Sequence, residues 1–287
     1  MIDGKTRLVG VMGWPVSHSL SPAMHNAAFA AVRLPWAYVP LPVSPERVGE
    51  AVRGLVALGF VGANVTVPHK GAVIPFLDRL TPAAEAIGAV NTIIVDSEGH
   101  LTGDNTDAAG FLAALREEEI DPTKHSPLIL GAGGAARAVA YALSQSGVEP
   151  VIIVARNGAK AQRLADELHQ ATGKAFTVRR LPDDLAELAR GADLIINATS
   201  VGMAPQAAAS PWPEDIPLRR EMIVYDLVYT PAETLFLRQA RAAGARAIGG
   251  LGMLVHQGAA AFRLWTGVEP PIGVMRRACE IRLRSRR

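Results

Sequence analysis

The sequence predicts an α/β protein of two domains, and three observations support this prediction. Short apolar runs alternate with helical patterns along the whole chain, which is typical of βαβ units. A glycine-rich turn near residue 131 lies between such a run and a predicted helix. The length of 287 residues corresponds to two domains at about 150 residues each.

The first half has four apolar runs that we predict to be strands: Leu8–Met12, Ala37–Leu41, Ala63–Val67 and Thr92–Val95. Helices are predicted over Pro22–Val32 and Pro45–Leu58. Ser21 and Ser44 precede the proline of each helix, so we predict that they are N-caps. The alternation predicts a parallel sheet.

The second half repeats this alternation. Its predicted strands are Leu128–Leu130, Val151–Val154, Leu194–Asn197, Ile223–Leu227 and Ala245–Ile248, and its predicted helices are Ala135–Ser146 and Ala159–Ala171. A helix near Thr106–Gly110 marks the boundary, which predicts domains over 1–107 and 108–249. The tail, 250–287, is predicted to be helical and to pack back on the first domain.

Composition excludes several classes of protein. The 29 basic and 27 acidic residues give a net charge of +2, so we expect no nucleic-acid partner. Cys279 is the single cysteine and no H-E-x-x-H pattern occurs, so we expect neither disulfides nor a metal site. The chain has no pattern of a signal peptide and no apolar stretch of ~18 residues, so we expect a cytoplasmic protein without a membrane partner. The arginine-rich terminus is interpreted as a solvated helix end.

The glycine-rich turn predicts a dinucleotide site. Gly131-Ala132-Gly133-Gly134-Ala135-Ala136 follows the apolar run 128–130 and opens a helix, which gives the pattern G-x-G-x-x-A. The first glycine allows the tight turn, and the second lets the backbone approach a pyrophosphate. The amides at the start of the helix then face the phosphates.

The residue after the next strand indicates which dinucleotide binds. An NAD site has an acidic residue about 20 residues past the motif, where it contacts the ribose 2′-hydroxyl. Here Arg156 stands at that position, Lys160 follows it, and 155–162 contain no acidic residue. Two cations suit a 2′-phosphate, so the sequence predicts NADP.

Polar residues gather where predicted strands end. Ser17 and Ser19 follow the first strand, where hydroxyls next to a helix start suit a carboxylate or a phosphate. Asn64 and Thr66 share one face of the third strand, and Lys70 follows, where a lysine in a cleft can act as a general acid or base. The segments 88–92 and 103–107 add further amides, hydroxyls and Asp107. Each residue alone has an ordinary structural interpretation.

Taken together, these segments resemble the shikimate dehydrogenase family. The matching segments are SHSLSPAMHNAAF (17–29), GANVTVPHK (62–70), GAVNT (88–92), GDNTDAAGF (103–111), GAGGAARA (131–138), INATSVGM (196–203), YDLVYTP (225–231) and GGLGMLVHQGAAAF (249–262). They extend along almost the whole chain. The resemblance implies an N-terminal substrate domain, a Rossmann-type NADP domain and C-terminal helices that return to the first domain. It also implies the reversible NADPH-dependent reduction of 3-dehydroshikimate to shikimate, a step in chorismate and aromatic amino acid biosynthesis.

The resemblance also implies roles for individual residues. Lys70 and Asp107 would be the catalytic pair, which we expect to act as a coupled unit. The substrate contacts would come from Ser17, Ser19, Thr66, Asn91, Tyr229 and Gln257. Asn64, counted with these residues, would support the catalytic pair. NADP would be bound by Gly131, Ala132, Gly133, Gly134, Ala135, Ala155, Arg156, Asn157 and Lys160. Leu227, Gly250 and Met253 would line the nicotinamide end.

One departure from the family pattern limits the cofactor prediction. The usual Asn-Arg-Thr with a further Arg is here Ala155-Arg156-Asn157 with Lys160, which favours a weaker preference for NADP over NAD than is usual. A quinate/shikimate dehydrogenase with relaxed cofactor use is therefore an alternative, although Ser19 stands where some quinate enzymes have threonine. A non-catalytic NADP-binding sensor on the same fold is a remote alternative, because Lys70 and Asp107 are both present. Another two-domain reductase is disfavoured by the segments 17–26 and 64–70. The sequence leaves monomer and homodimer open.

Overall fold

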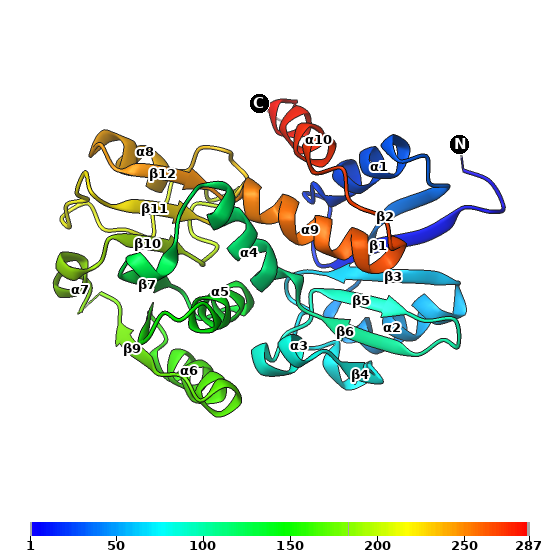
Figure 1. The fold of residues 1–287 in the computed structure, drawn as a ribbon, viewed down its shortest axis with the longest axis horizontal. Helices are drawn as coiled ribbons and strands as arrows, with labels where there is room; N and C mark the ends of the chain where they lie inside the picture. The colour runs from blue at the N-terminus through cyan, green and yellow to red at the C-terminus, as the bar shows by residue number, and fades with distance from the viewer. Residues whose placement is uncertain (1, 183, 286–287) are drawn as a thin grey trace. The chain divides into compact units, whose positions relative to one another are not determined.

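The protein is a mixed α/β structure of two compact units, in a computed structural model that describes residues 2–182 and 184–285 (Figure 1). Unit 1 contains the chain up to Gly110 and from Leu254 onward, and unit 2 contains Phe111–Met253. Helices α4 (Thr106–Glu117) and α9 (Leu251–Thr266) contain the two points where the chain passes from one unit to the other.

The sheet of unit 1 has the strand order β2-β1-β3-β5-β6-β4. Its strands are β1 (Arg7–Gly13), β2 (Trp36–Pro42), β3 (Phe60–Val65), β4 (Arg79–Leu80), β5 (Thr92–Val95) and β6 (Leu101–Asp104). Strand β1 is parallel to β2 and β3, but β5 is antiparallel to both β3 and β6. The prediction of a parallel sheet is therefore wrong for this half.

A tight turn explains the antiparallel pair. Asp96 accepts hydrogen bonds from the amides of Glu98 and His100, both at 2.9 Å, and Gly99 has φ +86°. A side chain that bonds to amides two and four residues ahead closes the loop, and glycine supplies the positive φ without steric cost. The chain consequently reverses between β5 and β6 as a hairpin.

The helices of unit 1 differ from the predictions mainly at their ends. They are α1 (Ser21–Ala31), α2 (Val48–Ala57) after a 3₁₀ turn (Pro45–Arg47), α3 (Pro82–Ile87), a 3₁₀ turn (Ile74–Phe76), the start of α4, most of α9, and α10 (Ile272–Arg284). The prediction that Ser21 is an N-cap is wrong, because Ser21 is the first helical residue and Leu20 precedes it without a side-chain cap. Ser44 does precede its turn, but its side chain makes no capping bond.

The C-terminal helices belong to the core of unit 1. Helix α10 packs along α1. From α9, the Trp265 indole donates a hydrogen bond to the Ile93 carbonyl at 3.0 Å, directly over Gly62. A Cβ at Gly62 would lie 2.4 Å from the indole nitrogen, so only glycine lets the helix approach the sheet this closely.

The edge strand β2 is closed by a side chain. Asn26 of α1 accepts a hydrogen bond from the Tyr38 amide and donates one to the Tyr38 carbonyl, both at 2.9 Å. The side-chain amide thus takes the place of a neighbouring strand at this residue. Pro40 and Pro42 are oriented like Tyr38 along the strand and have no N–H to donate.

Unit 2 is a doubly wound parallel sheet with the order β12-β11-β10-β7-β8-β9. Its strands are β7 (Pro127–Leu130), β8 (Val151–Ala155), β9 (Phe176–Arg180), β10 (Leu194–Asn197), β11 (Ile223–Asp226) and β12 (Arg246–Gly249), and its helices are α5 (Gly134–Gln145), α6 (Gly158–Thr172), α7 (Leu185–Gly191) and α8 (Leu235–Ala242), with a 3₁₀ turn (Pro122–Lys124). Numbered from β7, this is the order 3-2-1-4-5-6 of a Rossmann fold, which confirms the prediction. Ligands of such folds bind where the order reverses, between β7 and β10.

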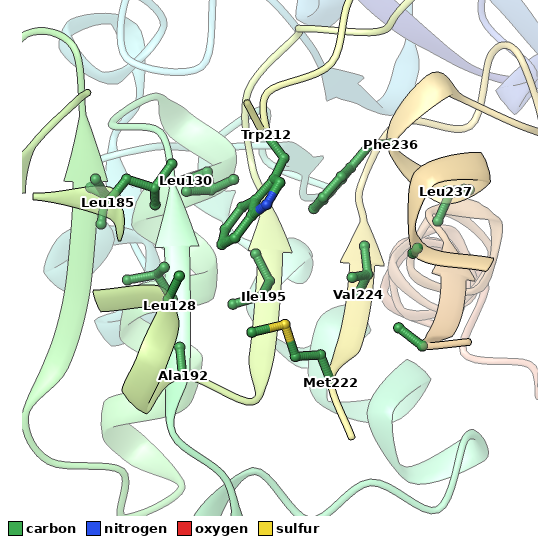
Figure 2. Close-up of a cluster of buried hydrophobic side chains, with 14 residues drawn as sticks. Leu128, Leu130, Leu185, Ala192, Ile195, Trp212, Met222, Val224, Phe236 and Leu237 are labelled. Atoms are coloured by element: carbon green, nitrogen blue, oxygen red, sulfur yellow. The ribbon is translucent and has the colours of Figure 1, made fainter. Parts of the chain in front are cut away.

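One face of this sheet is covered by a large apolar cluster. Trp212 packs against Phe236, with ring centroids 6.2 Å apart, and both lie over Leu130, Ile195 and Val224 of the central strands (Figure 2). The Trp212 indole donates to the Ile216 carbonyl at 2.8 Å, so the ring is buried without losing its hydrogen bond. This cluster fixes the strands whose carboxyl ends carry the candidate cofactor residues.

A histidine is buried in the core of unit 1. His25 is fully buried and stacks on Tyr38 at 4.4 Å, with Phe29, Phe262 and Trp265 around it. Neither ring nitrogen has a hydrogen-bond partner among the described residues. Burial therefore lowers the pKa of His25 from 6.5 to about 3, because a charged imidazole has no compensation there.

This histidine predicts a specific loss of stability in acid. Between pH 6.5 and about 3 the unfolded chain takes up a proton that folded His25 does not, so His25 contributes a fall of about 1.4 kcal/mol per pH unit in the free energy of unfolding. The contribution is fully present above pH 6.5. We expect His25→Phe to make the pH dependence shallower by this amount in denaturant titrations. Phe29→Leu, in the same cluster, should lower stability and keep the wild-type slope; equal slopes for wild type and His25→Phe would contradict the prediction.

Candidate functional site

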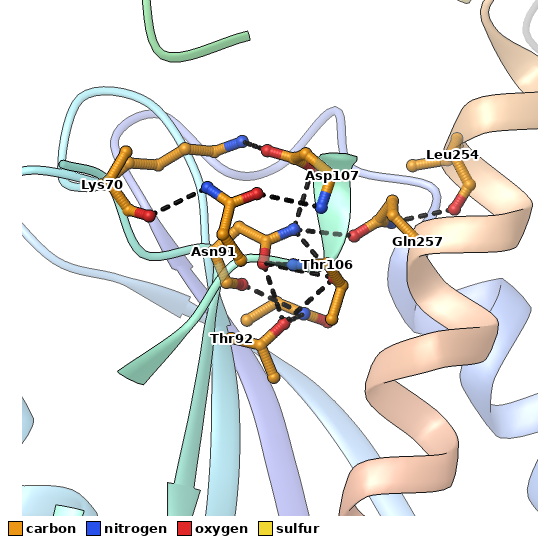
Figure 3. Close-up of polar contacts among 10 residues, drawn as sticks. Lys70, Asn91, Thr92, Thr106, Asp107, Leu254 and Gln257 are labelled. Carbon is orange, nitrogen blue, oxygen red and sulfur yellow. Dashed lines mark hydrogen bonds and ion pairs between the residues drawn. The ribbon is translucent and has the colours of Figure 1, made fainter. Parts of the chain in front are cut away.

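Unit 1 brings Lys70 and Asp107 together as an ion pair (Figure 3). Lys70 lies on the loop after β3, and Asp107 lies in the first turn of α4. Asn105 accepts a hydrogen bond from the Asp107 amide at 3.1 Å, which fixes the start of that helix. The side chains are 18% and 8% exposed, so the pair is largely shielded from water but the lysine is accessible.

Asn91 holds the second oxygen of the carboxylate. Its Nδ2 donates to Asp107 Oδ1 at 2.8 Å, to Thr106 Oγ1 at 3.0 Å and to Gln257 Oε1 at 3.3 Å. Its Oδ1 accepts from the Thr106 amide at 2.7 Å. Asn91 therefore joins the start of β5, the start of α4 and helix α9, as Figure 3 shows.

The main chain places Lys70 on the same side. The Val90 amide donates to the Lys70 carbonyl at 2.8 Å, so the residue before Asn91 is bonded to the residue that carries the ammonium. His69 is buried and its Nε2 lies 2.7 Å from the Val43 carbonyl, which anchors the same loop beyond the end of β2. Lysine and carboxylate are thus fixed by separate elements.

Asn64 is engaged entirely by the protein. Its Oδ1 accepts from the Tyr38 hydroxyl at 2.8 Å, and its Nδ2 donates to the Asn91 carbonyl and to Thr92 Oγ1, each at 3.1 Å. With three partners and 6% exposure, its side chain supports Asn91 rather than facing outward. Sequence reasoning missed Tyr38, and no motif pointed to it.

The remaining unit 1 candidates are Thr66, Ser17, Ser19 and Gln257. Thr66 is half-buried and close to Gly13, where a Cβ would lie 2.4 Å from the Thr66 methyl group. Ser17 is exposed, and Ser19 is half-buried and accepts a hydrogen bond from the Ser21 amide at 3.2 Å. Gln257 donates to the Leu254 carbonyl at 2.8 Å, which leaves its oxygen directed at Asn91.

Chemically, this arrangement suits proton transfer at a hydroxyl or carbonyl oxygen. A lysine ammonium has three donor hydrogens, and the carboxylate takes only part of them. Asn91 and Gln257 supply neutral donors and acceptors beside the pair, which suits a polyhydroxylated ligand. Sequence reasoning did not include Thr106, whose hydroxyl and amide complete the contacts of Asn91.

Unit 2 has the features of a pyrophosphate cradle. Gly131 has φ +119°, and a Cβ there would lie 3.0 Å from the Ala198 carbonyl oxygen, so the turn requires glycine. Gly133 precedes α5 without a side-chain capping bond, and a Cβ built on it meets nothing within 4 Å. Open space in front of the uncapped amides of a helix start fits the phosphates of a dinucleotide.

The residues for the ribose end follow β8. Arg156, Asn157 and Lys160 are exposed around the start of α6, whereas Ala155 is buried as the last residue of β8. Asn157 caps this helix, because its Oδ1 accepts from the Lys160 amide at 2.9 Å. Two cations at an exposed helix start fit a phosphate monoester, so the chain has residues suited to NADP.

Two of the nicotinamide-end candidates are in contact in unit 2. A Cβ at Gly250 would lie 2.1 Å from the Leu227 carbonyl oxygen, so these two backbones are in direct contact. Met253 is on the first turn of α9, and Tyr229 is half-buried on the loop after β11. Tyr229 is the one substrate candidate that belongs to unit 2.

Two features, a membrane-spanning helix and a cluster of metal ligands, are absent from the part of the chain that the structure describes. No helix within 2–182 or 184–285 has the length and apolar character to span a membrane. Across the same ranges, no three His, Cys, Asp or Glu side chains gather as they would around a metal ion.

Comparisons with known proteins agree along nearly the whole chain. Residues 11–93 match the family described as shikimate dehydrogenase substrate binding domain, 114–205 match shikimate / quinate 5-dehydrogenase, and 250–280 match shikimate 5'-dehydrogenase C-terminal domain. The shikimate dehydrogenase (NADP(+)) of Methanopyrus kandleri is 49% identical over 279 residues, which cover 96% of each chain.

Solved structures are similar as well. A crystal structure of a shikimate dehydrogenase in complex with NADP+ is 42% identical with a TM-score of 0.91, covering 99% of this chain and 98% of the other. The quinate dehydrogenase of Corynebacterium glutamicum in complex with NAD is 35% identical with a TM-score of 0.87, covering 95% and 98%. On its sequence, its fold and the arrangement of these side chains, the chain belongs to the shikimate dehydrogenase family.

Proposed function

We propose that this protein is an oxidoreductase that reversibly reduces 3-dehydroshikimate to shikimate with NADPH, in chorismate and aromatic amino acid biosynthesis. The observation that carries the proposal is the Lys70–Asp107 pair, held on one side by Asn91 and accessible on the other. The similarity to shikimate dehydrogenases over nearly the full chain supports the same reaction.

Lys70 moves the proton in this proposal. NADPH, when bound, supplies the hydride that reaches the carbonyl carbon. The Lys70 ammonium gives a proton to the carbonyl oxygen, which becomes the new hydroxyl, and the neutral amine regains a proton from water. In the reverse direction Lys70 accepts the hydroxyl proton. Asp107 orients the ammonium through one oxygen and contacts the substrate hydroxyl beside it, while Asn91 prevents the carboxylate from turning.

Hydroxyls and amides recognise the substrate. Ser17 and Ser19 bind the carboxylate group, and Thr66, Asn91, Tyr229 and Gln257 contact the carboxylate or the ring hydroxyls. Asn64 acts through Asn91. A site built from polar groups that bond substrate hydroxyls discriminates strongly against analogues that lack them.

Unit 2 binds NADP in this proposal. The turn 131–135 takes the pyrophosphate, and Ala155, Arg156, Asn157 and Lys160 surround the 2′-phosphate. Leu227, Gly250 and Met253 contact the nicotinamide.

We propose the domain bounds 1–107, 108–249 and 250–287, with the last segment packed on the substrate domain. We also propose a cytoplasmic enzyme that acts on small molecules without nucleic-acid or membrane partners, as a monomer or a homodimer.

The alternative function is a quinate/shikimate dehydrogenase with relaxed cofactor use, and it is supported by a quinate dehydrogenase in complex with NAD that has the same fold. Lys160 in place of a second arginine also favours relaxed cofactor use. The non-catalytic alternative is disfavoured by the preformed ion pair. Initial rates with shikimate or quinate, each with NADP⁺ or NAD⁺, separate the three functions. Turnover mainly with shikimate and NADP⁺ supports the proposal, comparable rates with quinate or NAD⁺ support the alternative, and no turnover supports a sensor.

Loss of the Lys70 ammonium should affect turnover more than binding. We expect Lys70→Ala to lower kcat by about 10²- to 10⁴-fold, since general acid–base catalysis contributes about that much. The dissociation constant for shikimate, measured by calorimetry, should change only a few-fold, because the other contacts remain. Lys124→Ala, on an exposed 3₁₀ turn, is the matched control. An unchanged kcat in folded Lys70→Ala would exclude Lys70 as the proton donor.

Loss of the Arg156 charge should weaken the preference for NADP⁺. We expect Arg156→Gln to raise the KM for NADP⁺ by about 10- to 100-fold, since a hydrogen bond to a charged group contributes about 1.5–3 kcal/mol. The KM for NAD⁺ should stay nearly constant, because that cofactor has no 2′-phosphate. Arg163→Gln, exposed on α6, which begins just after Arg156, should change neither value. Equal effects on both cofactors would show that Arg156 does not read the 2′-phosphate.

A further inference from the structure

Asp226 is a buried carboxylate that the proposed reaction does not use. It is the last residue of β11, and it is fully buried. Three donors surround it: Asn197 Nδ2 at 2.8 Å and the Val228 amide at 3.0 Å on Oδ1, and the Thr234 hydroxyl at 2.6 Å on Oδ2. Burial raises the pKa of Asp226, and these hydrogen bonds oppose that shift. Burying the Asp226 carboxylate is unfavourable, and an apolar side chain would fill the same space, so packing alone does not explain this residue.

The first donor leads to the loop after β10. Asn197 accepts through Oδ1 from the Thr199 amide at 3.0 Å and from the Thr199 hydroxyl at 2.7 Å. Thr199 in turn accepts from the Val201 amide at 3.1 Å. This loop packs directly on the glycine turn, because a Cβ at Gly131 would lie 3.0 Å from the Thr199 methyl group and from the Ala198 carbonyl oxygen.

The other donors lead to the loop after β11. The Val228 amide bonds Asp226 directly, so the carboxylate fixes the turn that contains Leu227. The Gly250 amide donates to the Val228 carbonyl at 3.3 Å, and Gly250 touches the Leu227 backbone. Thr234 caps α8 through the Leu237 amide at 3.2 Å, so its hydroxyl joins Asp226 to the start of that helix.

We propose that Asp226 is a positioning residue that holds the loops 198–201 and 227–234 in one fixed arrangement at the carboxyl end of the unit 2 sheet. It thereby sets the nicotinamide-end residues Leu227 and Gly250 relative to the pyrophosphate turn at Gly131. The inference rests on the proposed function, since it gives these loops the task of binding NADP. It assigns no contact between Asp226 and the cofactor.

The chemistry explains why a carboxylate occupies this position. Three donors, from the end of β10, the loop after β11 and the cap of α8, converge on a single side chain, and the two oxygens of Asp provide enough lone pairs for all of them. In Asp226→Asn, the new side chain keeps one oxygen that accepts from Asn197 and Val228, and its NH₂ group faces Thr234. Asn therefore keeps the link between the two loops, whereas Leu removes every one of these bonds at similar volume.

The test measures cofactor geometry separately from the amount of folded enzyme. We expect Asp226→Leu to raise the dissociation constant for NADPH, followed by its fluorescence, and the KM for NADP⁺ by about 10- to 100-fold, because the loops lose hydrogen bonds to a charged group, and such bonds contribute effects of this size. The primary deuterium isotope effect with shikimate labelled at the reacting carbon should also change. Asp226→Asn should restore both values to within a few-fold of wild type. Shikimate binding, measured by calorimetry, should be unchanged and reports that unit 1 is folded.

Two further variants keep the test decisive. Asp193→Asn is the matched control, because Asp193 precedes β10 at its opposite end and bonds the Ser126 amide at 2.6 Å; it should change neither cofactor value. If Asp226→Leu does not fold, Thr234→Val removes the bond to Oδ2 and should raise the NADPH dissociation constant several-fold, with Thr234→Ser as its rescue. The inference would be overturned if folded Asp226→Leu bound NADPH and showed the isotope effect as the wild type does. If Asp226→Leu does not fold, the same result in Thr234→Val would overturn it. Wild-type enzyme that neither binds NADPH nor turns over shikimate would overturn the proposed function as well.

Discussion

A carboxylate that is removed from water must be surrounded by donors, and unit 1 is organised around this requirement at Asp107. Asn91 supplies one donor and Lys70 supplies the other, and each is fixed by further hydrogen bonds, Lys70 through the Val90 amide and Asn91 through Asn64 and Thr106. Asn64 and Tyr38 extend the same network into the aromatic core, where His25 stacks on the tyrosine ring. Each member is oriented by its neighbours, so protein contacts hold the ion pair in place, and a preorganised pair of this kind needs little reorganisation during the reaction.

Much of this organisation was predictable from local patterns. The glycine turn with a strand before it and a helix after it predicted the Rossmann unit, and the strand order confirms that prediction. Polar residues near strand ends indicated the candidate site as a group, because Lys70 follows the strand that carries Asn64 and Thr66, although each residue alone has an ordinary structural interpretation. The family resemblance then supplied roles that spacing alone did not determine.

The parts that were missed depend on contacts between distant residues or on weak local patterns. Strand β6 contains Gly103 and ends in Asp104, so it has little strand character, and only its pairing with β5 defines it. Strand β9 is a half-exposed edge strand with two arginines, which hides its alternation. The bond between Tyr38 and Asn64 joins residues 26 positions apart, and no spacing rule predicts such a pair. Asp226 is part of the segment YDLVYTP (225–231), but only the fold shows that its side chain is buried.

The closed edge of β2 has a consequence for how copies of this protein can meet. An exposed edge strand is a template for intermolecular sheet growth and for aggregation. Asn26 occupies both hydrogen-bonding groups of Tyr38, and the prolines that follow offer no donor, so a second chain finds few partners along this edge. A homodimer of this protein would therefore be built from side-chain packing rather than from a continuous intermolecular sheet at β2.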